Sequence, residues 1–224
     1  MTLRQRVAAE AVGTAFLVMA VVGSGIAAQR LSPSDVGLQL LENSLATGAV
    51  LVALILALQP VSASFNPVVT LVERVLGQVS TAEAAASVAA QISGGLLGAV
   101  LANLMFDLDA ISFSDQHRVD HGSLLAEVVA TVGLVVIVFG SLRAGRHDTV
   151  AYAVGGYITA AYWFTSSTSF ANPAVTLART VSDTFAGIAP ASVPPFILMQ
   201  IIGGGVGLGL VVLLHPTSRE GATT

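Results

Sequence analysis

Long apolar runs, separated by short polar or Pro-rich breaks, dominate the chain. A hydrocarbon core of about 30 Å needs roughly 20 apolar helical residues to cross it. Six runs meet this requirement: 8–28, 38–59, 81–106, 124–142, 149–168 and 193–214. The first run is too long for the apolar part of a usual signal peptide, so we interpret it as a retained span. The pattern therefore predicts six transmembrane helices.

The composition points to the same class of protein. Apolar residues make up 54% of the 224 residues and charged residues only 10%, whereas soluble domains carry about 25% charged residues. That is too little charge to cover a solvated surface, which argues against a soluble enzyme. The chain has no Cys and a net charge of -4 without a basic tract, so disulfides, thiolate metal sites and nucleic-acid partners are not expected. We expect a single membrane domain over 1–224, in contact with lipid.

The chain contains an internal duplication. Three segments recur in the same order: 9–24 with 126–141, 66–71 with 172–177, and 91–98 with 200–207. Each half, about 8–106 and 124–215, holds three predicted spans. Because three is an odd number, the second half must lie upside down relative to the first. An acidic loop, 107–123, joins the halves.

The middle pair of repeated segments contains an Asn-Pro sequence in each copy. Asn66-Pro67 and Asn172-Pro173 lie in apolar, Pro-broken stretches that are too short to cross the membrane and return as full helices. Asn is a favoured N-cap and Pro a favoured first helical residue, so each pair predicts the start of a half-length helix. In an inverted repeat the two starts meet at mid-membrane. We expect each Asn amide group to be free there as a donor, beside two helix N-termini of about +0.5 charge each that repel cations.

Basic residues predict the orientation in the membrane. Arg4 and Arg6 precede the first span, and Arg143 and Arg146 lie between the fourth and fifth spans. The acidic loop instead carries several Asp residues against one Arg. By the positive-inside preference, both termini are cytoplasmic and the acidic loop faces outward, in a bacterial-type inner membrane.

Taken together, these features resemble the aquaporins, or major intrinsic proteins, over essentially the full length. The residues that carry the resemblance are Ala9-Glu10 with Gly13-Thr14, Ser62 to Thr70, Gln91 with Gly94 and Gly98, Glu127, and Phe170 to Ala174. The resemblance implies an all-α membrane fold with six tilted helices and two re-entrant half-helices. It also implies passive conduction without catalysis or a cofactor, and a homotetramer with one pore per protomer.

The resemblance also assigns roles to individual residues. Asn66 and Asn172 become pore donors, and the half-helices begin at Pro67, Val68, Pro173 and Ala174. By spacing, the selectivity filter consists of Thr47, Ala160, Ser169 and Val175, with Ala46 as the alternative to Thr47. None of these is aromatic or His, so we expect a wide filter.

Three positions depart from the usual pattern of the family, and the first is Val68, which stands where members usually have Ala. Val175 stands where members usually have a filter Arg, and Ser64 stands where many have a His. Arg179 follows one helical turn later, about 6 Å along the axis, and we do not expect it to replace the missing charge fully. The filter is therefore expected to be uncharged as well as wide.

Glu10 and Glu127 are acidic residues that lie inside predicted spans, at symmetric places in the two halves. A proton-coupled solute transporter would use such groups, because burying them is costly. Their symmetric placement favours another role, in which each carboxylate accepts hydrogen bonds from the backbone of a re-entrant loop. The four His residues lie in loops or at span ends and do not form a metal-ligand pattern.

A wide neutral filter with the hydroxyl groups of Thr47 and Ser169 suits water, glycerol-like polyols and undissociated arsenous acid. The segment from Asn172 to Arg179, with Val175 in place of Arg, resembles the bacterial aquaglyceroporin-like branch associated with arsenic resistance, whose substrates are trivalent arsenicals. A general water and glycerol facilitator is the alternative within the class. A proton-coupled solute transporter is the alternative from another class.

Overall fold

The computed structural model describes residues 1–216, and these contain α-helices and short 3-10 helices but no strand. Residues 217–224, which we included in the single domain, lie outside the described residues. Six long helices correspond to the predicted spans: α1 (Leu3–Leu31), α2 (Val36–Leu58), α4 (Thr81–Met105), α5 (His121–Arg143), α6 (Val150–Phe164) and α8 (Val193–Leu214).

The fifth span is shorter than predicted. The expected segment was 149–168, but α6 has 15 residues and ends at Phe164, whereas five other helical segments of the described chain are long and apolar enough to cross a membrane. The helix ends because Thr165 adopts an extended backbone, with φ -112° and ψ 134°, and the chain then turns through Thr168 and Ser169, which have positive φ angles of 60° and 51°. The residues after Phe164 instead lead into the second re-entrant loop.

Two half-helices begin at the Asn-Pro sequences. They are α3 (Pro67–Val75) and α7 (Pro173–Ala178), and α7 continues as the 3-10 turn η1 (Arg179–Val181). In each, Asn is the N-cap with an extended backbone, and its side chain accepts a hydrogen bond from the first turn. A second 3-10 turn, η2 (Pro190–Ser192), precedes α8.

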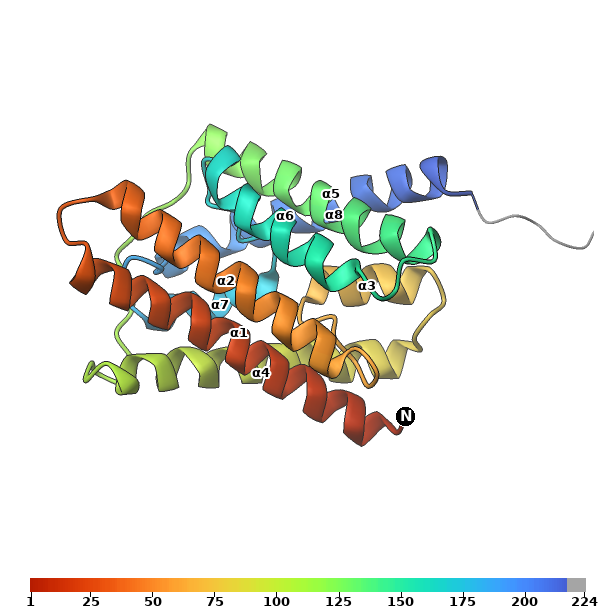
Figure 1. Cartoon of the computed structure of the whole chain (residues 1–224), viewed down its shortest axis with the longest axis horizontal. Helices are drawn as coiled ribbons and strands as arrows, with labels where there is room; N and C mark the ends of the chain where they lie inside the picture. The colour runs from red at the N-terminus through yellow and green to blue at the C-terminus, as the bar shows by residue number, and fades with distance from the viewer. Residues whose placement is uncertain (217–224) are drawn as a thin grey trace, which may run out of the picture.

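The two halves pack in the same way. In the first half α1 packs along α4, in the second α5 packs along α8, and α2 contacts α6 between them. Figure 1 shows the long helices running roughly along the long axis of the molecule, while α3 and α7 extend toward opposite ends. The N terminus and the end of α8 share one end, here called the N-terminal end. The acidic loop lies at the other, here called the acidic-loop end.

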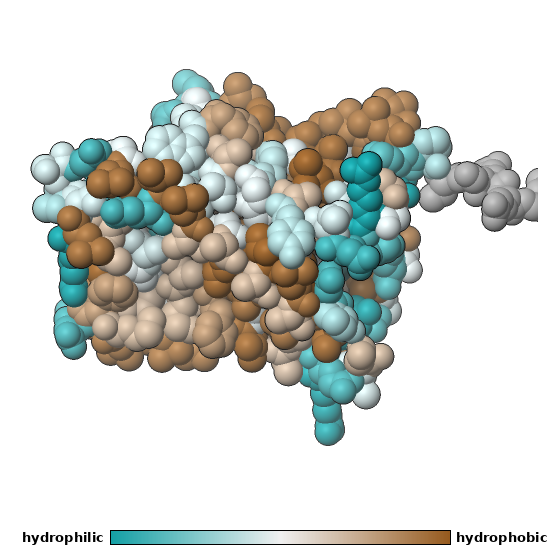
Figure 2. All heavy atoms as spheres, in the orientation of Figure 1, coloured by the Kyte–Doolittle hydropathy of each residue, from teal (hydrophilic) through white to brown (hydrophobic). Residues whose placement is uncertain are grey.

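The surface is divided in a way that fits a membrane. On the visible face, apolar and weakly polar residues cover the middle of the molecule, and hydrophilic residues gather at the two ends (Figure 2). Large exposed apolar side chains come from several helices, including Phe16 of α1, Leu45 of α2 and Leu97 of α4. An aqueous surface rarely carries so large an apolar area, so this girdle faces lipid or another apolar surface.

Glycines allow the closest helix contacts. A Cβ atom placed on Gly94 or Gly98 of α4 would lie 2.2 Å from a backbone oxygen of α1. Gly203 and Gly207 of α8 approach α5 in the same manner. Small residues at such crossings bring backbones together where apolar lipid provides no hydrophobic drive for association.

We predict that Gly98→Ala lowers the thermal stability of the chain in detergent, because its methyl group would collide with backbone that cannot move aside. Overpacking of this kind costs about 1–3 kcal/mol. The apparent melting temperature, followed by size-exclusion chromatography after heating, measures the effect. Gly209→Ala on α8 is the matched control, because a Cβ there meets nothing within 4 Å; equal losses for the two variants would contradict this account of the α1–α4 contact.

Candidate functional site

The first re-entrant loop is held by a buried carboxylate on α1. Glu10 accepts hydrogen bonds from the backbone N–H groups of Ser64 (2.9 Å) and Phe65 (2.8 Å). Gln91 of α4 donates its Nε2 group to the same carboxylate at 2.7 Å. Backbone N–H groups of a loop inside the membrane have no water to bind, so the buried carboxylate serves as their hydrogen-bond acceptor.

The second loop repeats this arrangement with Glu127 of α5. Its two carboxylate oxygens accept from the N–H groups of Phe170 and Ala171, each at 2.9 Å. Gln200 of α8 donates to the same carboxylate at 2.6 Å. Each half thus uses one Glu and one Gln, at equivalent positions, to hold its re-entrant loop.

The residue before each Asn takes a left-handed backbone conformation. Phe65 has φ 47° and Ala171 has φ 46°, which costs about 1–2 kcal/mol per residue for a non-glycine side chain. The carbonyl groups of these residues accept hydrogen bonds from the opposite half: Asn172 Nδ2 donates to Phe65 O and Asn66 Nδ2 donates to Ala171 O, both at 2.7 Å. The two half-helices are therefore joined reciprocally at their starts.

This junction corrects one expectation about the Asn side chains. Each Oδ1 caps its own helix, at 2.9 Å from Val68 N and 3.0 Å from Ala174 N. We expected both amide hydrogens to be free, but one of the two on each Asn donates to the other loop. The physical reason is that the loop carbonyls would otherwise be unsatisfied inside the membrane. One N–H group per Asn remains for a solute.

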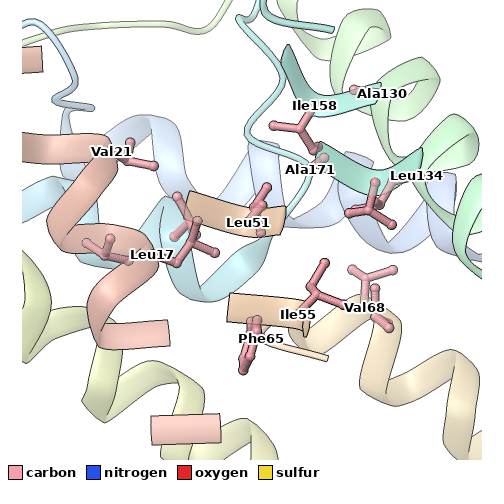
Figure 3. Close-up of a cluster of buried hydrophobic side chains, with 14 of the residues drawn as sticks. Leu17, Val21, Leu51, Ile55, Phe65, Val68, Ala130, Leu134, Ile158 and Ala171 are labelled. Carbon is pink, nitrogen blue, oxygen red and sulfur yellow. The ribbon is translucent and has the colours of Figure 1, made fainter. Parts of the chain in front are cut away.

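A cavity of about 470 Å³ passes both Asn residues. Around the half-helix junction its wall is mostly aliphatic. Figure 3 shows Leu17 of α1, Leu51 and Ile55 of α2, Leu134 of α5 and Ile158 of α6 close to this region; all five line the cavity. The lining continues to Gln59, Pro60 and His147 in one direction and to Arg179 in the other.

Three of the four expected filter residues line this cavity: Thr47, Ser169 and Val175. Of the two alternatives on α2, Thr47 lines the cavity and Ala46 does not. Ala160 is exposed on the outside of α6 and does not line the cavity, so its assignment is corrected. Tyr162 lines the cavity instead, and its hydroxyl lies 3.2 Å from Thr47 Oγ1. A shift of two residues turns a side chain by about 200° around a helix.

The half-helix starts themselves are packed rather than exposed to the cavity. Pro67, Val68, Pro173 and Ala174 are all buried. Val68, which stands where the family usually has Ala, packs beside Gly204 of α8, where a Cβ would approach Val68 Cγ1 to 2.4 Å. The extra volume of Val at this position is thus matched by the missing side chain of the glycine.

The lumen is not uncharged, because Arg179 lines it and is only 2% exposed to the exterior. Its guanidinium carbon lies 3.5 Å from the centre of the Phe170 ring, and Nε donates to the carbonyl of Ala186. Arg118, from the acidic loop, lies 5.3 Å from the same ring and donates to Gly187 O at 2.7 Å. Burial lowers the pKa of Arg118 from its ordinary value. A charged residue therefore lies on the cavity wall one helical turn beyond Val175.

Sequence reasoning did not assign Tyr162 or Glu73, two polar residues of the cavity wall, to the pore. Tyr162 follows Ala160 by two residues on α6, and spacing along the sequence did not show that its side chain faces the cavity. Glu73, on α3, also lines the cavity. The signal for Glu73 was present, since the duplication places it opposite Arg179.

Comparison with known proteins agrees with this architecture. The family described as MIP, major intrinsic protein, matches residues 1–149. The aquaglyceroporin AqpS of Rhizobium meliloti (strain 1021) is 47% identical over 218 residues, which cover 97% of this chain and 93% of that protein. The chain belongs to the major intrinsic protein family. Members of this family are membrane channels and not enzymes, so this major intrinsic protein is a multi-pass membrane channel.

Solved structures show the same fold. The X-ray structure of the aquaglyceroporin from Plasmodium falciparum matches this major intrinsic protein with a TM-score of 0.69 and 18% identity, over 97% of each chain. An ion channel of the FNT family matches with a TM-score of 0.50 and 13% identity, over 94% of this chain and 86% of that one. At these identities the likeness concerns the fold alone. The predicted all-α aquaporin-like fold is confirmed.

We predict that Glu127→Gln destabilises this major intrinsic protein. A neutral amide has one acceptor oxygen for the two N–H groups of Phe170 and Ala171, and leaving a buried donor unsatisfied costs about 1–3 kcal/mol. The apparent melting temperature in detergent and the water permeability in proteoliposomes should both fall.

Glu42→Gln is the control for this prediction. One Glu42 oxygen accepts from Ser32, and the other is buried without a partner in the described part of the chain. A Glu127→Gln chain as stable as the Glu42→Gln chain would show that the second loop does not depend on its carboxylate.

Proposed function

We propose that this chain is a passive channel for small uncharged solutes: glycerol-like polyols, trivalent arsenicals such as undissociated arsenous acid, and water. The observation that carries the proposal is the cavity of about 470 Å³, which runs past Asn66 and Asn172 and has an uncharged wall at the level of Val175. An Arg at that position would narrow the passage. Val leaves room for a solute with a carbon or arsenic centre.

The wall at this level combines apolar surface with a few hydroxyl groups. Ser169 Oγ is buried and has no hydrogen-bond partner within residues 1–216, so a solute hydroxyl group can pair with it. Thr47 and Tyr162 supply two more hydroxyl groups, which contact each other at 3.2 Å. Polyols and arsenous acid carry several hydroxyl groups around a compact centre, and such mixed sites suit them.

The centre of the cavity favours neutral hydrogen-bond acceptors. The remaining N–H group of each Asn can donate to a solute oxygen. The N-termini of α3 and α7 meet there, and their partial positive charges oppose cations. A neutral solute pays no electrostatic penalty at this point, which supports passive diffusion of uncharged molecules.

The contacts of the two buried carboxylates count against a proton-coupled transporter. Glu10 and Glu127 each accept two backbone N–H bonds and one amide bond. Protonation would remove acceptors that the loops need, so neither group is free to carry protons in a transport cycle. A channel predicts flux that does not saturate and does not respond to a pH gradient.

The general water and glycerol facilitator remains the alternative within the class. The names of the relatives, two of them aquaglyceroporins, support polyol conduction, and the arsenical substrate is the additional step of the proposal. We also propose an inner-membrane location with both termini cytoplasmic, since Arg4, Arg6, Arg143 and Arg146 lie toward the N-terminal end. A homotetramer would cover part of the exposed apolar girdle.

We predict that Val175→Arg reduces the permeability to glycerol and arsenous acid by about tenfold or more while water permeability is largely kept, because a long side chain narrows the passage to near the width of a water file. Stopped-flow light scattering on proteoliposomes measures all three rates. A pH-sensitive dye followed in parallel reports any proton leak.

Val175→Leu is the matched control, since it adds volume without charge or reach, and it should keep most of the glycerol flux. A native chain that conducts water alone would refute the polyol and arsenical proposal. Glycerol flux without arsenous acid flux would leave the general facilitator as the correct description. Unchanged large-solute flux in Val175→Arg would remove Val175 from the filter.

A further inference from the structure

The duplication places two charged residues at equivalent positions. At the repeat offset of 106, the matched pairs are Asn66 with Asn172, Val69 with Val175, and Glu73 with Arg179. In each half the three residues follow the spacing i, i+3, i+7, which lies along one helix face. All six line the cavity. The innermost two pairs are alike, and the outermost pair has opposite charges.

The two charges lie toward opposite ends of the lumen. The half-helices extend from the centre in opposite directions (Figure 1), so Glu73 lies toward the N-terminal end and Arg179 toward the acidic-loop end. Glu73 and Arg179 are the lining residues whose side chains carry a formal charge when ordinary pKa values apply at neutral pH. His147 is a further titratable lining residue.

Glu73 differs from the loop-holding carboxylates in its partners. Both of its oxygens accept from one hydroxyl group, Ser64 Oγ, each at 2.9 Å. No backbone N–H group is bound to it in the described part of the chain, in contrast to Glu10 and Glu127. Glu73 therefore does not hold the loop backbone, and its carboxyl group lies at the cavity wall.

Arg179 is held rigidly at the other end. The Phe170 ring and the carbonyl of Ala186 hold its guanidinium group, and Phe170 also lines the cavity. An arginine remains charged in essentially any protein environment. The lumen thus has a carboxyl group toward one end and a positively charged guanidinium group toward the other.

We infer that Glu73 and Arg179 together set the charge selectivity of the channel, Arg179 against cations and Glu73 against anions. This inference rests on the proposed function, because a wide passage for neutral solutes does not exclude ions by size. Any ion must pass both ends of the lumen, whichever side it comes from. One group that repels cations and one group that repels anions are therefore sufficient. Both charges act in a confined lumen, where water and salt screen them less than in bulk solution.

The two charges do not contribute equally. A cation is opposed by Arg179 and again by the two half-helix N-termini at the centre. An anion is attracted by both of those features, and Glu73 is the group that opposes it. Loss of Glu73 should therefore change ion permeability more than loss of Arg179.

The test uses the full-length chain in proteoliposomes at mildly alkaline pH, so that carboxyl groups are ionised. Chloride permeability is measured with a potassium ionophore present, and sodium and proton fluxes are measured under a diffusion potential. We expect E73Q to raise chloride permeability by about tenfold or more, and R179M to raise sodium and proton permeability by a smaller factor. E73D and R179K keep the charges and should remain closed to ions.

Two control variants each remove a charge of the same sign as Glu73 or Arg179, at a position that lies away from the lumen. Arg30 also packs on a phenylalanine ring and donates to a backbone carbonyl, both of Phe106. Glu83 accepts a hydrogen bond from the backbone N–H group of Ser80. Neither residue lines the cavity, so R30Q and E83Q should leave all ion permeabilities unchanged.

Glycerol permeability of the same vesicles separates the possible failures. E73Q vesicles that pass glycerol normally but remain closed to chloride would overturn the inference. If E73Q misfolds and loses glycerol flux, the R179M variant tests the inference instead. Sodium permeability of R179M at the native level would overturn the inference, and a rise in sodium permeability would support it. Native vesicles without glycerol flux would refute the proposed function, while a chloride leak in E73Q would still support the assignment of charge selectivity.

Discussion

The structure depends on one constraint: a loop that enters the membrane must have all its backbone polar groups satisfied there. Glu10 and Glu127 satisfy the loop N–H groups, and Asn66 and Asn172 satisfy the carbonyls of the opposite loop. Remove these partners and each loop would leave several polar groups in an apolar medium. The cavity exists because this network holds two half-helices with their starts in contact, rather than letting the chain cross as a continuous helix.

The same network explains why strain is tolerated at the centre. Phe65 and Ala171 both adopt left-handed conformations that L-residues avoid. In return, their N–H groups point to the Glu of their own half and their carbonyls to the Asn of the other. Each Asn then caps its own helix and bridges to the opposite loop. Little of the amide is left for solutes, and what remains is held in a defined direction.

The specificity of the channel depends on lining side chains that differ between the two halves of this symmetric frame. Val69 and Val175 occupy equivalent positions, yet the wall near Val175 also has Ser169, Thr47 and Tyr162. Beyond the valines the chain places a carboxylate at one end and a guanidinium group at the other. The frame needs symmetry for its hydrogen bonds, whereas the lumen needs different groups at its two ends because solutes must be selected and not merely admitted.

The sequence by itself determined the apolar spans, the duplication and the two helix starts, because these follow from local hydrophobicity, repeated residues and the capping chemistry of Asn-Pro. It also placed Thr47, Ser169 and Val175, which lie near repeated landmarks. It misjudged Ala160, because spacing along the sequence does not fix which face of α6 meets the lumen, and it misjudged the end of the fifth span, because Thr165 adopts an extended backbone that ends α6. Only the tertiary structure decided which face of a helix meets the lumen, which amide hydrogens are already used, and that Arg179 reaches the cavity, since each depends on contacts between segments far apart in the chain.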